Sequence, residues 1–306
     1  MRLLAFRSMA VWLTFSLILA ILLILGGMIA ISRLYKTPQI PHRKTPASLD
    51  IPFEEIRFPT TGGKELYGWW IPALGTSGAA VPTLILVHGW RRNVERLLPF
   101  IRWLAPAGYN LLVFDARNHG SSDSDGHATM LKFAQDIQAA LDEALRRPEV
   151  RPDQLGVFAL SIGGAAAIYA AAHDSRIRTI VTVGAFAHPG DIMRQDLLQR
   201  GVPTVATPAI LRYMERQVGA RLDDIAPERQ IASLNIPVLL IHGEEDVVIP
   251  PEHGRRLAAA ADNSTLWTVP DQGHSDCDRH PEFWPTVIEF LKSAFSPSGG
   301  RDQGQR

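Results

Sequence analysis

A serine, an aspartate and a histidine stand in an order and in local contexts that suit nucleophilic catalysis. Ser161 lies in the pentapeptide Ala-Leu-Ser-Ile-Gly, Asp246 ends Gly-Glu-Glu-Asp, and His274 ends Asp-Gln-Gly-His. A serine hydroxyl is a poor nucleophile until a neighbouring base accepts its proton. That base is usually a histidine whose orientation a carboxylate fixes. We therefore predict that Ser161 is a nucleophile, His274 its general base and Asp246 the carboxylate.

Other residues of the same types are weaker candidates for these roles. Glu244 and Glu245 are the rivals of Asp246, but Asp246 starts a loop ending at Pro250 whose turn could hold a short carboxylate rigidly. His274 directly follows the last predicted strand. Three further histidines fall on or beside predicted helices, where we expect solvated or packing roles: His173, His253 and His280.

The residues around Ser161 predict a sharp turn between a strand and a helix. Residues 154–160 are largely apolar, and the segment after Gly163 is rich in alanine, the best helix former. The small side chains at Ala159 and Gly163 would let the two elements approach closely. This is the nucleophile-elbow arrangement, with alanine in place of the first glycine of G-x-S-x-G. The alternative is that Ser161 is an N-cap at the start of the helix.

Two backbone N–H groups are expected to stabilise the negative charge of a tetrahedral intermediate. One is that of Ile162, directly after the nucleophile. The other is that of Trp90, in the loop after the first buried parallel strand. Arg91 and Arg92 adjoin this loop, and they could meet an anionic headgroup or substrate carboxylate, or form a solvated pair.

Strand-like and helix-like segments alternate along most of the chain, which predicts a mostly parallel sheet with helices on both faces. The predicted strands span 54–58, 66–71, 83–87, 110–114, 154–160, 177–183, 237–242 and 265–269. The predicted helices include 94–105, 128–147 and 282–294. Functional residues in such sheets gather at the carboxyl ends of the strands. Asp115 also follows a strand, but we interpret it as a structural cap of the 117–120 loop.

Between the sixth and seventh strands, alternation gives way to two predicted helices, 191–200 and 208–218. Inserted at this point, they predict a small helical cap spanning about 187–234. Its apolar side chains could line an acyl pocket or pack the cap onto the core. These side chains belong to Met193, Leu197, Leu198, Ile210, Leu211, Tyr213 and Met214.

The two ends of the chain differ from this pattern. Residues 9–31 carry no charge, and as a helix they would span about 34 Å, enough to cross a bilayer. We therefore predict an N-terminal transmembrane anchor (1–36), with a cleaved signal peptide as the alternative, and a location in the cell membrane. The side on which the catalytic domain lies stays open. A proline-rich linker (37–52), the α/β domain (53–295) and a disordered tail (296–306) follow.

The composition argues against several classes of function. Lys plus Arg and Asp plus Glu both number 31, so no overall field favours nucleic acid. The single cysteine, Cys277, rules out an intrachain disulfide. No cysteine or histidine cluster has zinc-ligand spacing. We expect no metal, no cofactor and a small-molecule substrate, and the oligomeric state is unknown.

Several short motifs together carry a resemblance to a known family: His88-Gly89, Asp115-x-Arg-x-His-Gly120, Ser161-x-Gly-Gly164, Gly243-x-x-Asp246 followed by Pro250, and Gly273-His274. With them the chain resembles the α/β-hydrolase superfamily over about residues 54–294. The pattern is similar to the serine-hydrolase branch that includes membrane-anchored ABHD-type hydrolases, monoacylglycerol-lipase-like enzymes and S33-type aminopeptidases. The resemblance implies an eight-stranded sheet and the same nucleophile, carboxylate and base. It departs at Ala159, where glycine is usual, and at Asn118, where glycine often precedes His-Gly.

The expected reaction is hydrolysis of carboxylic esters, including lipid-like acyl esters, through an acyl-enzyme intermediate. Hydrolysis of peptides or amides by the same three residues is an alternative. A hydrolase-like scaffold that binds without catalysis is a second alternative, and acyl transfer or thioester chemistry is a third.

Overall fold

The computed structural model describes residues 35–75 and 79–296, together with a few earlier positions: Trp12, Phe15, Gly26, Gly27 and Arg33. The chain divides into two compact units, Met1–Thr37 and Pro38–Arg306. The predicted transmembrane segment 9–31 lies almost entirely outside the described residues, as does the predicted tail after Ser296. Among the positions that are described, no helix has the length and apolar character needed to cross a bilayer. The anchor and the membrane location stay predictions.

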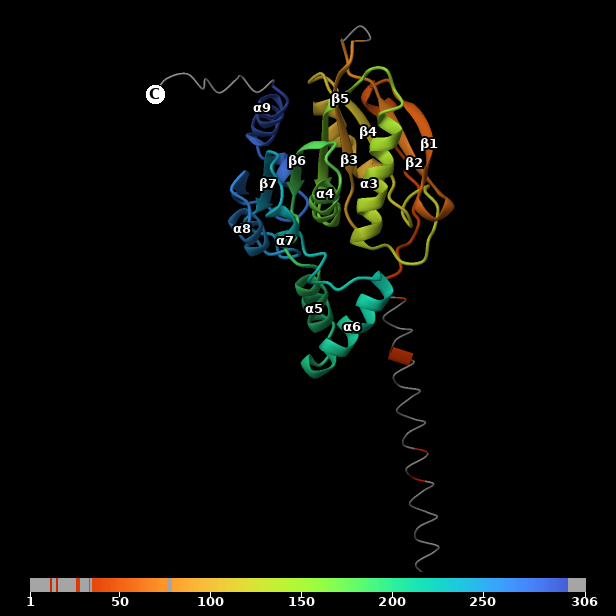
Figure 1. The fold of residues 1–306 in the computed structure, drawn as a ribbon, viewed down its shortest axis with the longest axis vertical. Helices are drawn as coiled ribbons and strands as arrows, with labels where there is room; N and C mark the ends of the chain where they lie inside the picture. The colour runs from red at the N-terminus through yellow and green to blue at the C-terminus, as the bar shows by residue number, and fades with distance from the viewer. Residues whose placement is uncertain are drawn as a thin grey trace, which may run out of the picture. The chain divides into compact units, whose positions relative to one another are not determined.

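The larger unit is built around one eight-stranded sheet in the spatial order β1-β2-β4-β3-β5-β6-β7-β8 (Figure 1). The strands are β1 (Glu54–Thr60), β2 (Lys64–Ile71), β3 (Val81–Val87), β4 (Asn110–Phe114), β5 (Val150–Leu160), β6 (Ile177–Val183), β7 (Val238–Gly243) and β8 (Ser264–Val269). β2 runs antiparallel to β1 and β4, and the other pairings are parallel. The prediction of a mostly parallel eight-stranded α/β sheet is confirmed.

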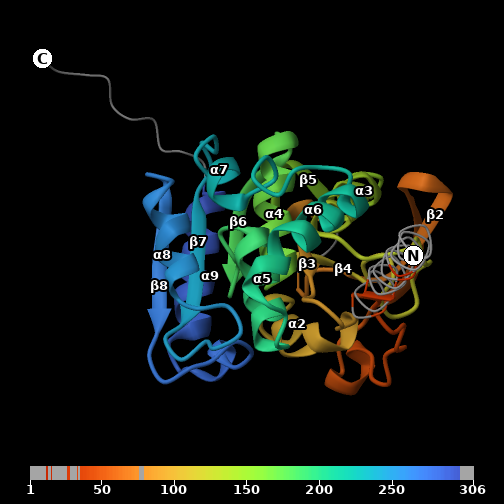
Figure 2. The ribbon, with the colours of Figure 1, turned by 90° about the horizontal axis from the view of Figure 1, so that it is seen from below.

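Helices cover both faces of this sheet (Figure 2). The α-helices that flank it are α2 (Leu98–Leu104), α3 (Met130–Ala144), α4 (Ile162–His173), α7 (Pro227–Ile231), α8 (Glu252–Ala259) and α9 (Phe283–Phe295). Short 3-10 helices are η1 (Pro46–Leu49), η2 (Thr61–Gly63), η3 (Val94–Leu97), η4 (Thr204–Ala206) and η5 (Cys277–Arg279). In Figure 2, α2 and α9 lie on one side of the sheet, and α3, α4 and α7 lie on the other. The central strands are therefore buried on both faces, which explains their continuous apolar runs.

Aromatic packing joins α2 and α9 to the sheet. The ring of Phe100 on α2 lies 5.1 Å from that of Phe158 on β5 and 6.3 Å from that of Phe283 on α9. All three side chains are almost fully buried, and each such burial contributes roughly 1.5–3 kcal/mol to the free energy of unfolding. A Cβ on Gly156 would lie 3.0 Å from the Phe295 ring, so the absence of a side chain there lets the end of α9 pack against β5.

Two further helices are inserted between β6 and β7. They are α5 (Pro189–Gln199) and α6 (Thr207–Val218), and each starts one or two residues before the predicted position. The His188 side chain caps α5 by accepting the N–H of Gly190 at 3.0 Å. Gly219 ends α6 in the left-handed conformation, at φ 80°, which glycine adopts without strain. In Figure 1, α5 and α6 extend beyond the end of the sheet.

Candidate active site

Ser161 sits at the predicted turn between β5 and α4. Its backbone has φ 55° and ψ −123°, a conformation that L-residues seldom adopt and that marks a strained turn. The Ser161 N–H donates to the Val183 carbonyl at 2.8 Å, which fixes the turn to β6. The hydroxyl makes no capping hydrogen bond to the helix. Ser161 therefore occupies the N-cap position of α4, but its hydroxyl does not cap the helix as the alternative expects.

Small residues around the turn permit the close approach of α4. A Cβ on Gly163 would lie 2.7 Å from the carbonyl oxygen of His88, so glycine is required there. Ala159 is buried in β5 between Val87 of β3 and Thr182 of β6, and the strand pairs on both sides with alanine in place of glycine.

The other departure from the family pattern has a backbone explanation. Asn118 has φ 68°, and after glycine, asparagine is among the residues that most readily adopt this left-handed conformation. Its Oδ1 accepts the N–H of Asp125 at 2.8 Å. Asparagine therefore replaces glycine at this position without disturbing the turn.

The structure brings the three predicted catalytic residues together. Nε2 of His274 lies 3.1 Å from Oγ of Ser161, and Nδ1 of His274 lies 2.7 Å from Oδ2 of Asp246. A carboxylate only accepts hydrogen bonds, so the neutral ring carries its hydrogen on Nδ1. Nε2 then faces the serine hydroxyl with its lone pair, ready to accept a proton.

Asp246 is held on both oxygens. Oδ1 accepts the backbone N–H groups of Val248 at 2.9 Å and Ile249 at 2.8 Å, which is the rigid turn that the sequence predicts. The Asp246 side chain is fully buried. Its two sequence rivals, Glu244 and Glu245, are exposed.

A second histidine faces the same carboxylate, and the sequence did not reveal it. His242 is buried in β7, its Nε2 lies 2.7 Å from the carbonyl oxygen of Ile249, and it is 3.5 Å from Oδ2 of Asp246. Burial alone would raise the pKa of Asp246, but bonds from His242, His274 and the Ile249 backbone hold that pKa well below its usual range. The carboxylate is therefore ionised near pH 7.

Gly184, just after β6, lies against the imidazole of His274 and was also not predicted. A Cβ at this position would lie 3.1 Å from Nδ1 and Cε1 of His274 and 3.5 Å from Oδ2 of Asp246. Gly184 has φ 66°, which further favours glycine. The site therefore requires a residue without a side chain on this side of the His274 ring.

The loop after β3 passes directly beside Ser161. A Cβ on Gly89 would lie 3.2 Å from Cβ and 3.8 Å from Oγ of Ser161. Among the described residues, no acceptor is bonded to the N–H of Trp90 or to that of Ile162. The oxyanion role of these two N–H groups stays a prediction. Arg91 and Arg92 are exposed.

Asp115 has the structural role that the sequence predicts. It is fully buried and accepts the backbone N–H groups of Val94 at 2.7 Å and Ser121 at 2.8 Å. A Cβ on Gly120 would lie only 1.9 Å from Oδ2 of Asp115. Asp115 therefore joins the loop after β4 to the start of η3.

The three histidines that the sequence places on or beside helices, and the cysteine, take no part in this arrangement. His173 contacts the Tyr169 carbonyl, His253 accepts the N–H of Ala187, and His280 packs edge-on against an indole. Burial raises the pKa of the Cys277 thiol to about 12, so it is protonated and is not a rival nucleophile. Within the described part of the chain, no three His, Cys, Asp or Glu side chains gather where they could hold a metal ion.

Two pockets lie away from the serine's immediate neighbours. One of about 780 Å³ opens between α5 and α6, and of the seven apolar residues predicted for the insertion only Leu211 lines it. Leu197, Leu211 and Met214 are buried, and the choice between lining an acyl pocket and packing the cap stays a prediction.

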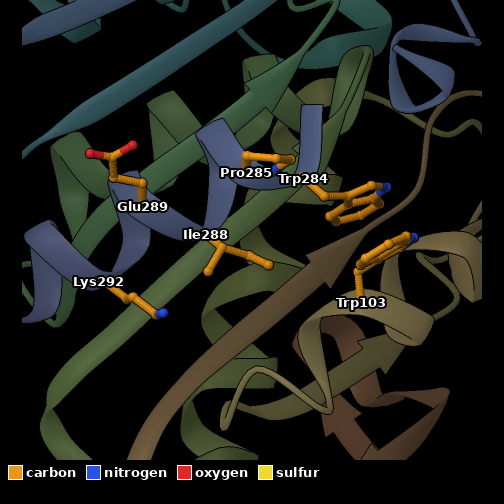
Figure 3. Close-up of a pocket in the computed structure, with 6 residues that line it drawn as sticks. All are labelled: Trp103, Trp284, Pro285, Ile288, Glu289 and Lys292. Carbon is orange, nitrogen blue, oxygen red and sulfur yellow. The ribbon is translucent and has the colours of Figure 1, made fainter. Parts of the chain in front are cut away.

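The other pocket, of about 420 Å³, lies between α2 and α9 (Figure 3). The indoles of Trp103 and Trp284 stack there, with ring centroids 5.6 Å apart. None of the predicted catalytic residues lines this pocket.

The chain is similar in sequence to two protein families and to several individual proteins. Residues 78–215 match the family described as serine aminopeptidase, S33, and residues 220–302 match the family described as TAP-like protein. An uncharacterized Escherichia coli K12 protein, YfhR, is 31% identical over 253 residues, covering 80% of this chain and 82% of that protein. The α/β hydrolase domain-containing protein WAV2 of Arabidopsis thaliana is 24% identical over 273 residues, covering 85% of each.

Among solved structures, an esterase of Pyrococcus furiosus superposes with a TM-score of 0.67 at 24% sequence identity, covering 85% of this chain and 97% of the esterase. At that identity the likeness concerns the fold alone.

Proposed function

This chain is a hydrolase of the α/β-hydrolase superfamily, and we propose that it cleaves carboxylic esters by nucleophilic attack of Ser161. One observation supports this most strongly. The imidazole of His274 bridges the Ser161 hydroxyl, at 3.1 Å, and the Asp246 carboxylate, at 2.7 Å. This is the nucleophile, base and orienting carboxylate that acyl transfer requires.

In the proposed reaction, Oγ of Ser161 attacks the ester carbonyl carbon while Nε2 of His274 takes the hydroxyl proton. A C–O bond forms to the serine, and the carbonyl π electrons move to the oxygen. When this tetrahedral intermediate collapses, the alcohol leaves and takes the proton from Nε2. Water then attacks the acyl-serine with His274 again as base, and the carboxylic acid is released.

The electrostatics support this sequence of steps. The ionised carboxylate of Asp246 stabilises the imidazolium that forms on His274 in each half-reaction. We assign the N–H groups of Trp90 and Ile162 as the donors to the oxyanion, because both lie beside Ser161 in sequence or space and neither is used within the described residues. Such donors act in a site already arranged for the developing charge.

The insertion of α5 and α6 supports a role as a cap over the site, since it leaves the sheet directly after β6.

We include lipid-like acyl esters in the substrate class, because the uncharged segment 9–31 is long enough to hold the enzyme at a membrane. Retention in the membrane fraction after alkaline carbonate washing is expected for an anchored chain. Release of the full-length chain by the wash would contradict the anchor.

Hydrolysis of amides is the second candidate, and the match of residues 78–215 to the family described as serine aminopeptidase, S33, favours it. A panel of p-nitrophenyl esters beside aminoacyl-p-nitroanilides distinguishes the two reactions. We expect turnover of esters by the wild type and none by Ser161→Ala. Faster turnover of the anilides would favour the peptidase, and equal turnover by Ser161→Ala would remove the serine from either reaction.

A further inference from the structure

Two buried histidines hold the loop that follows β3, and neither belongs to the proposed catalytic group. Nε2 of His88 accepts the backbone N–H of Ala116 at 3.1 Å, and its Nδ1 lies 2.8 Å from the carbonyl oxygen of Gly89. A backbone N–H only donates, so Nε2 carries no hydrogen and the hydrogen of the neutral ring is on Nδ1. His88 therefore donates to the Gly89 carbonyl.

His119 is held in the same tautomer. Its Nε2 accepts the backbone N–H of Arg91 at 3.2 Å, and its Nδ1 donates to the Arg117 carbonyl at 3.0 Å. The rings of His88 and His119 lie 5.0 Å apart, and both pack on Phe133 of α3. Burial lowers the pKa of His88 to about 3 and that of His119 to about 4, so both rings are neutral near pH 7.

These two bonds lie on either side of the Trp90 N–H. The Gly89 carbonyl and the Trp90 N–H belong to one planar trans peptide, so they point in opposite directions. The Gly89 oxygen is fixed by Nδ1 of His88 and by the N–H of Arg92 at 3.2 Å. On the far side, His119 fixes the N–H of Arg91, whose φ of 55° is unusual for a residue with a side chain. Rotating the peptide that carries the Trp90 N–H would break the His88 bond to the Gly89 carbonyl, and the His119 bond holds the following peptide, which limits how the loop can adjust.

We propose that His88 and His119 are positioning residues that hold the Trp90 N–H in the direction of the oxyanion, a role that rests on the proposed function. The hydrogen bonds of His88, like those of His119, require an uncharged side chain that donates from one atom and accepts at another. Because the oxyanion exists only in the transition state and intermediate, loss of this alignment should lower kcat more than it changes KM.

The test uses two pairs of variants in the full-length chain. At position 88, asparagine places an NH₂ where Nδ1 was and keeps the donor to Gly89, whereas glutamine reaches only the place of Nε2. At position 119, glutamine can accept the Arg91 N–H in the place of Nε2, whereas asparagine cannot. We expect His88→Asn to be more active than His88→Gln, and His119→Gln to be more active than His119→Asn. The less active member of each pair should lose about 10- to 100-fold in kcat.

The opposite order of kcat for asparagine and glutamine at the two positions distinguishes a role in aligning the Trp90 N–H from a role in packing. A purely structural role would rank asparagine and glutamine by volume, and hence in the same order at both sites. A second readout uses a thionoester substrate, whose sulfur is a poor hydrogen-bond acceptor. The difference within each pair should shrink to less than about threefold on this substrate, because the oxyanion contact is already weakened.

The outcomes distinguish this inference from the proposed function. If Ser161→Ala is inactive, yet the members of both pairs are equal in kcat or differ equally on ester and thionoester, the positioning role is wrong and the proposed function stands. If Ser161→Ala is fully active, the proposed function is wrong. Circular dichroism and thermal midpoints establish which variants fold. If one pair does not fold, the comparison of ester with thionoester turnover in the other pair tests the positioning role.

Discussion

Replacing Asp246 by asparagine would keep the shape of the side chain but reverse the proton arrangement in the site. Oδ1 of Asp246 accepts two backbone N–H groups, those of Val248 and Ile249. Only the amide oxygen of asparagine can accept these bonds, so its NH₂ must take the place of Oδ2. That place faces Nδ1 of His274 at 2.7 Å.

The NH₂ group donates, so Nδ1 of His274 has to accept and the ring hydrogen moves to Nε2. Nε2 lies 3.1 Å from Oγ of Ser161 and could then no longer take the hydroxyl proton. We expect kcat for Asp246→Asn to fall by about 10⁴-fold, which corresponds to about 5.5 kcal/mol in activation free energy. KM should change little, because the carboxylate does not contact the ester.

Steady-state hydrolysis of a p-nitrophenyl ester measures this effect, with the thermal midpoint as the check on folding. Glu245→Gln is the matched control, since it makes the same chemical change at the exposed neighbouring residue and should stay within about twofold of the wild type. A folded Asp246→Asn protein that loses less than tenfold would refute the tautomer argument. So would a loss in Glu245→Gln of the same size.

Three further outcomes follow from the same geometry. His274→Ala should lower kcat by at least about 10³-fold with the thermal midpoint kept, and a loss under tenfold would remove His274 from the base role. Gly184→Ala puts a methyl group 3.1 Å from the His274 ring and should lower kcat at least about tenfold, whereas Gly201→Ala, also at positive φ but in open space, should not. Because burial lowers the pKa of His88 from 6.5 to about 3, the folded state binds fewer protons than the unfolded state between these values. Urea titrations should therefore show that, between about pH 7 and about pH 5, the free energy of unfolding of the wild type falls by about 2 kcal/mol more than that of His88→Asn. Equal decreases in the two proteins would contradict this.

Much of the fold was predictable because buried parallel strands have a distinctive composition. The apolar runs at 83–87 and 110–114 can be satisfied only when both faces of a strand are covered. Each run ends in a polar motif, and parallel strands bring such ends to one edge of the sheet. The sequence alone therefore predicts Ser161, Asp246 and His274 as one group.

The elements that were missed lack a periodic signal. α7 has five residues and begins with Pro227, so it resembles a turn. α8 follows Pro250 and Pro251 and contains Gly254, which also indicates a turn. Gly254 is explained only by the fold, since a Cβ there would lie 2.9 Å from Nδ1 of His242.

The missed parts of the site depend on contacts between distant segments. His242 and Gly184 gain their roles from the Asp246 carboxylate and the His274 ring, which come from other elements. His88 and His119 read as parts of short motifs, but their tautomers follow only from the acceptors and donors that the fold brings to each nitrogen. Spacing along the sequence cannot supply such directions.

Active-site titration determines whether the Ser161 hydroxyl is the activated nucleophile. The purified full-length chain is treated with a stoichiometric fluorophosphonate, weighed by intact mass spectrometry and mapped by peptide. We predict a single adduct on the peptide that contains Ser161, loss of ester hydrolysis in proportion to labelling, and no adduct on Ser161→Ala. An adduct on another residue, or labelling of Ser161→Ala as complete as that of the wild type, would contradict it.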